Sequence, residues 1–260
     1  MPTLGDAEEL QGQRIDTGIP GLNRVLGTNR SDDRTGLHVP SVVILGGGQG
    51  SGKTTLILNM LANLKNALFL SSEQHLSEVK SSLIGIGLGW AADRIQAYSL
   101  LDDDCSFQKA MEVVRKVNPR VLAIDSVSEL KELGQKSSDP LAARVRMIRE
   151  LKNDAETHRR ATIMTAHFTK ADEIAGRREQ LHVVSTVMLM TRVDAKLRML
   201  SCPEKNRFGS IEERAYFEMS RKGLFEVSPP TADTEDMDDE TEHNIPDDVR
   251  RDWGLPVTEE

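Results

Sequence analysis

The segment GGQGSGKT, residues 47 to 54, has the residue types and spacing of a phosphate-binding loop. It matches the pattern G-x-x-x-x-G-K-[ST], with an apolar strand-like run before it and a helix-forming run after it. Glycines let backbone N–H groups surround phosphate oxygens, and a helix amino terminus adds partial positive charge. Lys53 is predicted to neutralise the β- and γ-phosphates of ATP. The predicted nucleotide-binding set is Gly47, Gly48, Gln49, Gly50, Ser51, Gly52, Lys53, Thr54 and Thr55.

Thr54 and Asp125 are the predicted ligands of Mg²⁺. The Thr54 hydroxyl closes the phosphate-binding motif, where it suits a magnesium ion. Asp125 ends the apolar run VLAID, so its carboxylate is expected at the sheet edge where open α/β folds bind ligands. An aspartate at a strand end is by itself more often a turn residue. Because the chain also has a phosphate-binding loop, we favour the metal-ligand interpretation of Asp125, with Ser126 next to Asp125.

Glu73 and His167 also follow predicted strands. Glu73 could orient or deprotonate the water that attacks the γ-phosphate. It could equally stabilise the first turn of the helix predicted over residues 74 to 86, where acids are favoured. His167 could sense the γ-phosphate and pass its state to the following loop, although a lone histidine at a strand end is more often structural. Both interpretations stay open for each residue.

The order of apolar runs predicts the scaffold that positions these side chains. Strand-like runs at 41–47, 67–72, 95–100, 120–126 and 161–167 alternate with helical patterns. Such alternation predicts an α/β fold with a mostly parallel sheet covered on both faces. Three later runs, at 184–190, 195–202 and 213–220, have only short loops between them and predict an antiparallel extension of the sheet.

A second stretch, EKNRFGS at residues 204 to 210, places two cations on one predicted loop. Residues i and i+2 of an extended segment point the same way, so Lys205 and Arg207 should project together while Asn206 faces back. For an isolated pair of this kind, a solvated turn is the more frequent explanation.

Composition divides the chain into three parts. Residues 1–13 form a flexible terminus, 14–228 the folded domain, and 229–260 an acidic tail predicted to be disordered. The tail carries twelve acidic residues and two arginines, which leaves the preceding 228 residues close to neutral. A protein partner could bind the tail, or the tail could compete with nucleic acid for basic loops. Cys105 and Cys202 lack metal-ligand spacing and are expected to be buried thiols.

No apolar run reaches membrane-spanning length, and the first residues lack the apolar block of a signal peptide. We therefore expect a cytoplasmic protein without a membrane partner.

Several segments, in this order, resemble the ATPase core of the bacterial RadA/Sms family. They are RIDTGIPGLNRVLG, the phosphate-binding loop, FLSSEQ, VLAIDS, TAHFTK, IAG and KNRFGS followed by FEMSRKGL, between about residues 14 and 227. The KNRFG stretch is the most family-specific. The resemblance implies a RecA-like P-loop NTPase, related to RecA and DnaB motors. It further implies a hexameric ring that hydrolyses ATP, acts as a DNA helicase on single-stranded DNA and drives branch migration in recombination and repair.

The resemblance also implies roles for distant cations. In a ring, Lys205 and Arg207 would reach the ATP of the neighbouring subunit, with Arg207 as an arginine finger. The loops after Asp125 and His167 would contact DNA through Lys131, Lys136, Lys170, Arg177 and Arg178. Two solvated loops are the alternative, since each also contains acids and neither offers an aromatic platform.

The chain departs from the family pattern in places. The family's four-cysteine zinc module and Lon-protease-like domain are not in this sequence, and Leu181 and Ser185 stand where relatives tend to carry acids. A different class of function also fits a nucleotide-binding ring: a KaiC-like regulatory ATPase that binds proteins and not DNA. Turnover that ignores DNA would distinguish it.

Overall fold

The computed structural model describes residues 13–28, 33–132, 140–167, 182–220 and 222–230. Residues 1–12 of the predicted flexible terminus and residues 231–260 of the acidic tail lie outside these residues, whereas Gln13 is described and belongs to a strand.

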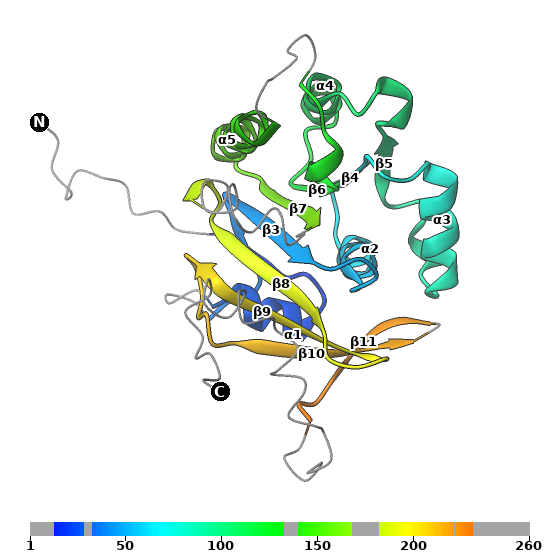
Figure 1. Ribbon diagram of the computed structural model, residues 1–260, viewed down its shortest axis with the longest axis vertical. Helices are drawn as coiled ribbons and strands as arrows, with labels where there is room; N and C mark the ends of the chain where they lie inside the picture. Colours follow the sequence, from blue (N-terminus) through cyan, green and yellow to red (C-terminus); the bar gives the residue numbers. More distant parts are fainter. Residues whose placement is uncertain (1–12, 29–32, 133–139, 168–181, 221, 231–260) are drawn as a thin grey trace, which may run out of the picture.

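One sheet organises the described residues (Figure 1). Its strands are β3 (Ser41–Gly47), β4 (Ala67–Ser71), β5 (Gln96–Ser99), β6 (Val121–Asp125), β7 (Ala161–His167), β8 (Thr186–Arg192), β9 (Leu197–Asn206), β10 (Arg214–Ser220) and β11 (Gly223–Val227). The nine strands follow the order β11-β10-β9-β8-β3-β7-β6-β4-β5. Strands β3 to β8 are parallel, and β9, β10 and β11 continue the sheet antiparallel. The predicted α/β class is therefore confirmed.

Within the described residues, five α-helices cover the two faces of the sheet. They are α1 (Pro20–Leu26), α2 (Lys53–Asn63), α3 (Leu76–Gly85), α4 (Phe107–Val117) and α5 (Pro140–His158). Alternate residues of β3 face opposite sides, as strand geometry requires. Val43 and Leu45 pack with α1, α2 and α3, whereas Val42 and Ile44 pack with α4 and α5. A strand buried on both faces explains why the run SVVILGG contains no charge.

Smaller elements complete the chain. A separate two-stranded sheet pairs β1 (Gln13–Ile15) with β2 (Leu37–Val39), and short 3-10 turns occupy Gly89–Ala91, Leu101–Asp103 and Val127–Glu129. The sequence pattern predicts neither the small sheet nor β11. Both consist of short runs of three to five residues, which carry little periodicity of their own.

The helix after the phosphate-binding loop ends at Asn63, because Leu64 is already extended and Ala67 begins β4. One predicted boundary differs from the structure. The antiparallel extension begins one strand later than predicted. Strand β8 still runs parallel to β3, and β9 is the first strand that runs antiparallel to its neighbour. Local pattern does not encode the direction in which a strand joins its neighbour.

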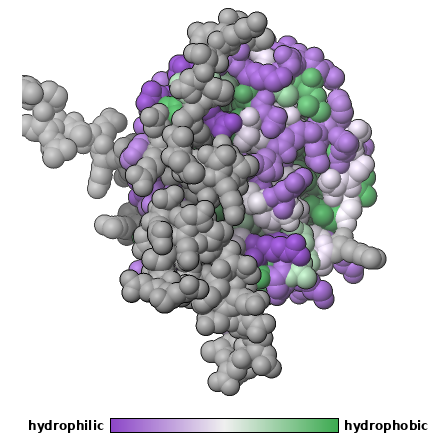
Figure 2. Space-filling model, viewed as in Figure 1, coloured by the Kyte–Doolittle hydropathy of each residue, from purple (hydrophilic) through white to green (hydrophobic). Residues whose placement is uncertain are grey.

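Both cysteines are buried, as predicted. Burial raises the pKa of the Cys202 thiol to about 12. The described surface in Figure 2 is mostly hydrophilic, with apolar side chains in small separate patches. Within the described residues, no helix combines the length and apolar character needed to cross a membrane.

Candidate functional site

The phosphate-binding loop, hereafter the P-loop, joins the carboxyl end of β3 to the amino end of α2. Its backbone turns at Gly52, which adopts φ +101° immediately before the helix. This left-handed dihedral favours glycine, and a β-carbon at Gly52 would also displace the Cε of Met219, which would lie 2.6 Å from it. The loop is thus held at the sheet edge by packing against β10.

The P-loop has the features that a phosphate chain needs. A β-carbon built on Gly48 or Gly50 would have no neighbour within 4 Å, so backbone at these positions faces open space. The Ser51 hydroxyl oxygen is buried and has no hydrogen-bond partner among the described residues. Backbone N–H groups, a spare hydroxyl and a helix amino terminus are the donor set that suits phosphate oxygens. The residues present therefore fit a nucleotide.

The Lys53 ammonium lies against this loop. Its Nζ donates to the carbonyl oxygens of Gly47 at 2.8 Å and Gly48 at 2.9 Å. Burial lowers the pKa of Lys53, and the carboxylates of Asp125 and Glu73 oppose that shift. The Lys53 ammonium and the open backbone N–H donors supply positive charge at the loop itself, and the two nearby carboxylates partly offset it.

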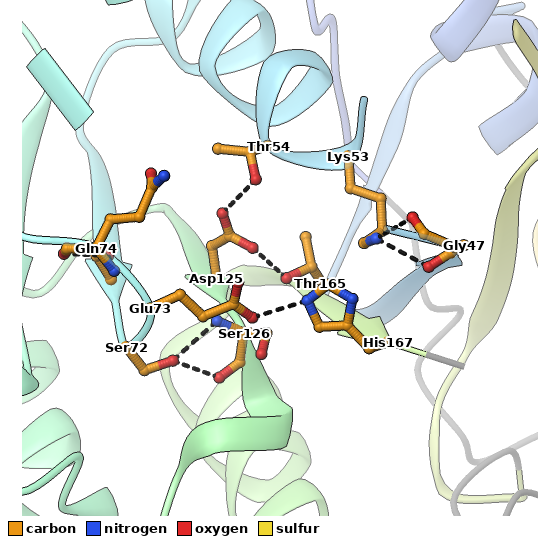
Figure 3. A network of polar contacts seen from close by, with 12 residues as sticks. Gly47, Lys53, Thr54, Ser72, Glu73, Gln74, Asp125, Ser126, Thr165 and His167 are labelled. Atoms are coloured by element: carbon orange, nitrogen blue, oxygen red, sulfur yellow. Dashed lines mark hydrogen bonds and ion pairs between the residues drawn. The ribbon is translucent and has the colours of Figure 1, made fainter. Parts of the chain in front are cut away.

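Asp125 is the central acceptor of the site (Figure 3). Its Oδ2 accepts a hydrogen bond from the Thr54 hydroxyl at 2.6 Å, which brings the two predicted magnesium ligands together as expected. Its Oδ1 accepts a second hydrogen bond from Thr165 on β7. A carboxylate and a hydroxyl at the amino end of α2 are hard oxygen donors, which suit Mg²⁺.

Ser72 fastens the end of β4 to the end of β6. Its N–H donates to the Asp125 carbonyl at 2.9 Å, and its hydroxyl donates to the Ser126 carbonyl at 2.6 Å. The Ser72 oxygen also accepts the Ser126 N–H at 2.8 Å. These contacts fix the backbone on either side of the Asp125 side chain, and they set the direction in which β4 leaves the sheet toward Glu73.

Glu73 and His167 meet above Asp125. Because β6 lies between β4 and β7, side chains from the two outer strands reach across its end, and Glu73 Oε1 lies 3.0 Å from His167 Nε2. Both side chains are about one third exposed. The helix-stabilising alternative for Glu73 does not hold: α3 begins at Leu76, and Glu78 accepts the N–H of its cap residue His75 at 2.9 Å.

Residues 205 to 207, which we call the KNR stretch, lie at the end of β9: Lys205 and Asn206 are its last two residues, and Arg207 follows. Asn206 faces back into the domain, as predicted, and its Nδ2 donates to the carbonyls of Val25 at 2.9 Å and Ser210 at 3.1 Å. The Nζ of Lys205 donates to the His182 carbonyl at 3.2 Å, and Arg207 is exposed. The N–H of Arg207 donates to the carbonyl of buried Ser185 at 3.1 Å. Asn206 and Ser185 therefore hold the strand end while the two cations face outward.

Phe208 anchors the same loop to the small sheet. Its ring stacks on His38 with 3.5 Å between centroids, and the Arg14 guanidinium lies 6.0 Å from it. A β-carbon on Gly209 would lie 2.7 Å from the Gly27 Cα, so glycine allows the loop to approach the end of α1. Sequence reasoning missed Arg14 and His38, because nothing local relates them to residue 208.

The KNR stretch lies away from the P-loop of its own chain. Lys205 pairs with Val187, which pairs with Ile44 in the middle of β3. Gly47 is three residues further along, so the P-loop begins about 10 Å beyond Lys205 along the strands and about 10 Å across them. In Figure 1 the β9 arrowhead points away from α2.

Similar proteins decide the family. No family model matches the chain. Curated relatives named DNA repair protein RadA do match: that of Pseudomonas aeruginosa is 32% identical over 241 residues, covering 89% of this chain and 49% of the relative. Over 89% of its length, this chain is therefore similar to about half of a RadA protein. The RadA of Haemophilus influenzae is 30% identical over 237 residues, with 89% and 49% covered. That of Listeria monocytogenes is 31% identical over 227 residues, with 84% and 46% covered.

The chain thus spans about half the length of the curated relatives it matches. The sheet order and the edge-bound P-loop agree with the RecA-like α/β fold that the RadA resemblance predicts.

The cations predicted to contact DNA are only partly described in this RadA-type core. Lys131 pairs with Asp104 at 2.7 Å, and its backbone bridges to Ser106, so it is fixed by local contacts. Its role toward DNA stays a prediction. Lys136, Lys170, Arg177 and Arg178 lie outside the described residues, as does Leu181.

Thr165 and Ser72 are site residues that sequence reasoning missed. A weak signal exists for Thr165: it stands two residues before His167, so both point to the same face of β7. Ser72 carries no such signal, since serine after a strand is ordinary loop composition. Only the strand order brings either residue to Asp125.

Removing the Thr165 hydroxyl should loosen Asp125 and weaken Mg²⁺ binding. We expect Thr165→Val, which keeps the shape, to raise the Mg²⁺ concentration needed for half-maximal ATP turnover about 10-fold, because outer-shell hydrogen bonds orient metal ligands. Magnesium titrations of turnover measure this. Thr162→Val is the matched control: Thr162 is buried on the same strand, and its hydroxyl has no partner among the described residues. Equal titration curves for both variants would contradict the role given to Thr165.

Proposed function

We propose that this chain is an ATP-hydrolysing subunit that works with copies of itself as a motor on single-stranded DNA, in DNA repair and recombination. One observation carries the proposal: Thr54, Asp125, Glu73 and His167 converge on the P-loop of a RadA-type core. The relatives' names supply the biological setting, since each is called a DNA repair protein.

The P-loop, Lys53, Thr54 and Asp125 have separate roles in ATP hydrolysis. The P-loop backbone and Lys53 hold the phosphate chain, and Lys53 offsets the charge that gathers on the γ-phosphate in the transition state. Thr54 and Asp125 hold the metal. Bound Mg²⁺ would neutralise phosphate charge during the displacement. Asp125 needs no proton transfer for this role, because both of its oxygens already accept hydrogen bonds from threonine hydroxyls.

Glu73 is the base that orients and deprotonates the attacking water. Its carboxylate is partly exposed, so water can reach it, and His167 fixes its direction from the end of β7. His167 leads directly into residue 168, where the predicted DNA loop starts. A change at the γ-phosphate that moves Glu73 would therefore alter the contact made by His167, which gives nucleotide state a short path toward that loop.

Lys205 and Arg207 act on a neighbouring subunit. They lie beside the amino end of β8, whereas the P-loop follows the carboxyl end of the parallel strand β3. An arginine side chain spans about 7 Å and cannot cover that separation within one chain. The observations that support action in trans are this separation and the rigid support of the stretch by Asn206 and Phe208.

Single-stranded DNA should stimulate ATP turnover. At low salt we expect a several-fold increase, because a motor couples hydrolysis to its track, and the increase should disappear near 200 mM salt as phosphate contacts weaken. Steady-state ATP hydrolysis with and without a single-stranded oligonucleotide measures this, with Lys53→Ala as the blank. Turnover that is the same with and without DNA at every salt concentration would refute the motor and leave a nucleotide-binding switch.

Mixing two inactive variants tests action in trans. Arg207→Ala subunits keep an intact P-loop, and Lys53→Ala subunits keep an intact Arg207. We expect a 1:1 mixture to recover a measurable fraction of turnover, up to about one quarter of wild type, because hybrid interfaces pair an intact P-loop with an intact Arg207. Each variant alone and a mixture with the double variant are the controls. No recovery at any mixing ratio would contradict the trans assignment.

A further inference from the structure

An apolar groove lies between α3 and the edge strand β5, which stand beside each other in Figure 1. We call it the α3 groove; its apolar wall includes Phe69, Leu76, Val79, Leu83, Ile95 and Ala97. Its volume of about 240 Å³ lies below the range of about 300 to 1,000 Å³ usual for small-molecule sites. The α3 groove therefore suits one large side chain better than a whole cofactor.

Exposed apolar side chains gather around this groove. Leu76, Ile84 and Trp90 are 39%, 56% and 53% exposed, and all three lie on α3 or on the 3-10 turn that follows it. Among the described residues, the other exposed large apolar side chains are Ile211 and Phe225, which lie elsewhere. A groove with exposed apolar side chains along its border is typical of a surface that binds a partner segment.

Two charges of opposite sign border the groove. Lys80 comes from α3 and Asp93 from the residues just before β5, and both side chains are exposed. Neither has an ion-pair partner in the part of the chain that the structure describes. A segment that binds here gains specificity if it presents an acid and a base next to an apolar anchor.

The chain itself contains such a segment outside the described residues. Arg251, Asp252 and Trp253 stand next to one another, and we call residues 251 to 255 the RDWGL segment. Trp253 is the one tryptophan, tyrosine or phenylalanine between residues 231 and 260. A large aromatic side chain next to both charges matches the groove in polarity and in charge.

The RDWGL segment can reach the groove within one chain. A β-carbon on Gly223, the first residue of β11, would lie 3.2 Å from Ile86, which follows α3. Pro230 comes seven residues after Gly223, so it lies at most about 25 Å from that contact. From Pro230 to Trp253 there are 23 residues, and a flexible coil of that length spans roughly 25 Å.

We propose that the RDWGL segment binds the α3 groove of its own chain, with Trp253 against the apolar wall, Asp252 facing Lys80 and Arg251 facing Asp93. Tethering favours the same chain as the source. A flexible linker gives an effective concentration on the order of 1 mM, so a contact of modest intrinsic affinity is occupied. The bound segment covers apolar side chains of α3 that are otherwise exposed to water.

The chain has two tryptophans, which makes this contact measurable. Trp90→Phe in the full chain leaves Trp253 as the fluorophore. In that background Ala97→Arg places a long side chain at the groove, and Gln96→Arg, the matched control, adds the same charge on the other face of the same exposed strand. Acrylamide quenching and the emission maximum of Trp253 are compared with those of a synthetic peptide of residues 247 to 257.

We expect acrylamide to quench Trp253 several-fold less in the full chain than in the peptide, and we expect its emission at shorter wavelength. Ala97→Arg should give the values of the peptide, whereas Gln96→Arg should keep the protected values. Lys80→Glu should weaken the protection, and Lys80→Glu plus Asp252→Lys should restore it, because the exchange keeps the two charges opposite.

Three results would overturn the proposal. Quenching of Trp253 as strong as in the peptide would leave the groove to a separate partner. Protection that persists in Ala97→Arg would place Trp253 at another site. Protection that increases with protein concentration would show that a second copy supplies the segment, since binding within one chain is independent of concentration. Failure of the charge exchange to restore protection would contradict the pairing of Lys80 with Asp252.

Discussion

The carboxylate of Asp125 is the contact on which the site depends. It is 4% exposed, and a buried carboxylate is costly unless hydrogen bonds or a cation compensate it. Here Thr54 donates from α2 and Thr165 donates from β7, and the positive charge of Lys53 lies nearby. One side chain thereby links the helix after the P-loop to two neighbouring strands, and the order β7-β6-β4 then lets Glu73 and His167 meet across it.

The same sheet separates two functions in space. Parallel strands deliver the P-loop, Glu73, Asp125 and His167 to one edge, whereas the reversal at β9 carries Lys205 and Arg207 away from it. Asn206, Phe208 and Gly209 secure that second region against α1 and the small sheet. The proposed action in trans would use this separation, since head-to-tail contacts bring one side of a copy to the other side of the next.

Sequence reasoning succeeded where the chemistry is local. The P-loop motif predicts its own turn and the helix after it. The run VLAID predicts both a buried strand and the acid at its end. The backward orientation of Asn206 followed from strand periodicity alone. Thr165, Ser72, His38 and Arg14 could not be found this way, because their partners are set by strand order and by the approach of α1 to residue 209.

Replacing Glu73 is the sharpest test of the proposed hydrolysis, because this one side chain is the proposed base of the site. Equilibrium binding of a fluorescent ATP analogue and ATP turnover are measured on Glu73→Gln, with Glu78→Gln as the control for the helix cap that follows it. The account predicts nucleotide affinity within about 3-fold of wild type and turnover lower by about 100-fold or more for Glu73→Gln, with Glu78→Gln close to wild type in both. Turnover by Glu73→Gln within about 3-fold of wild type would contradict the account.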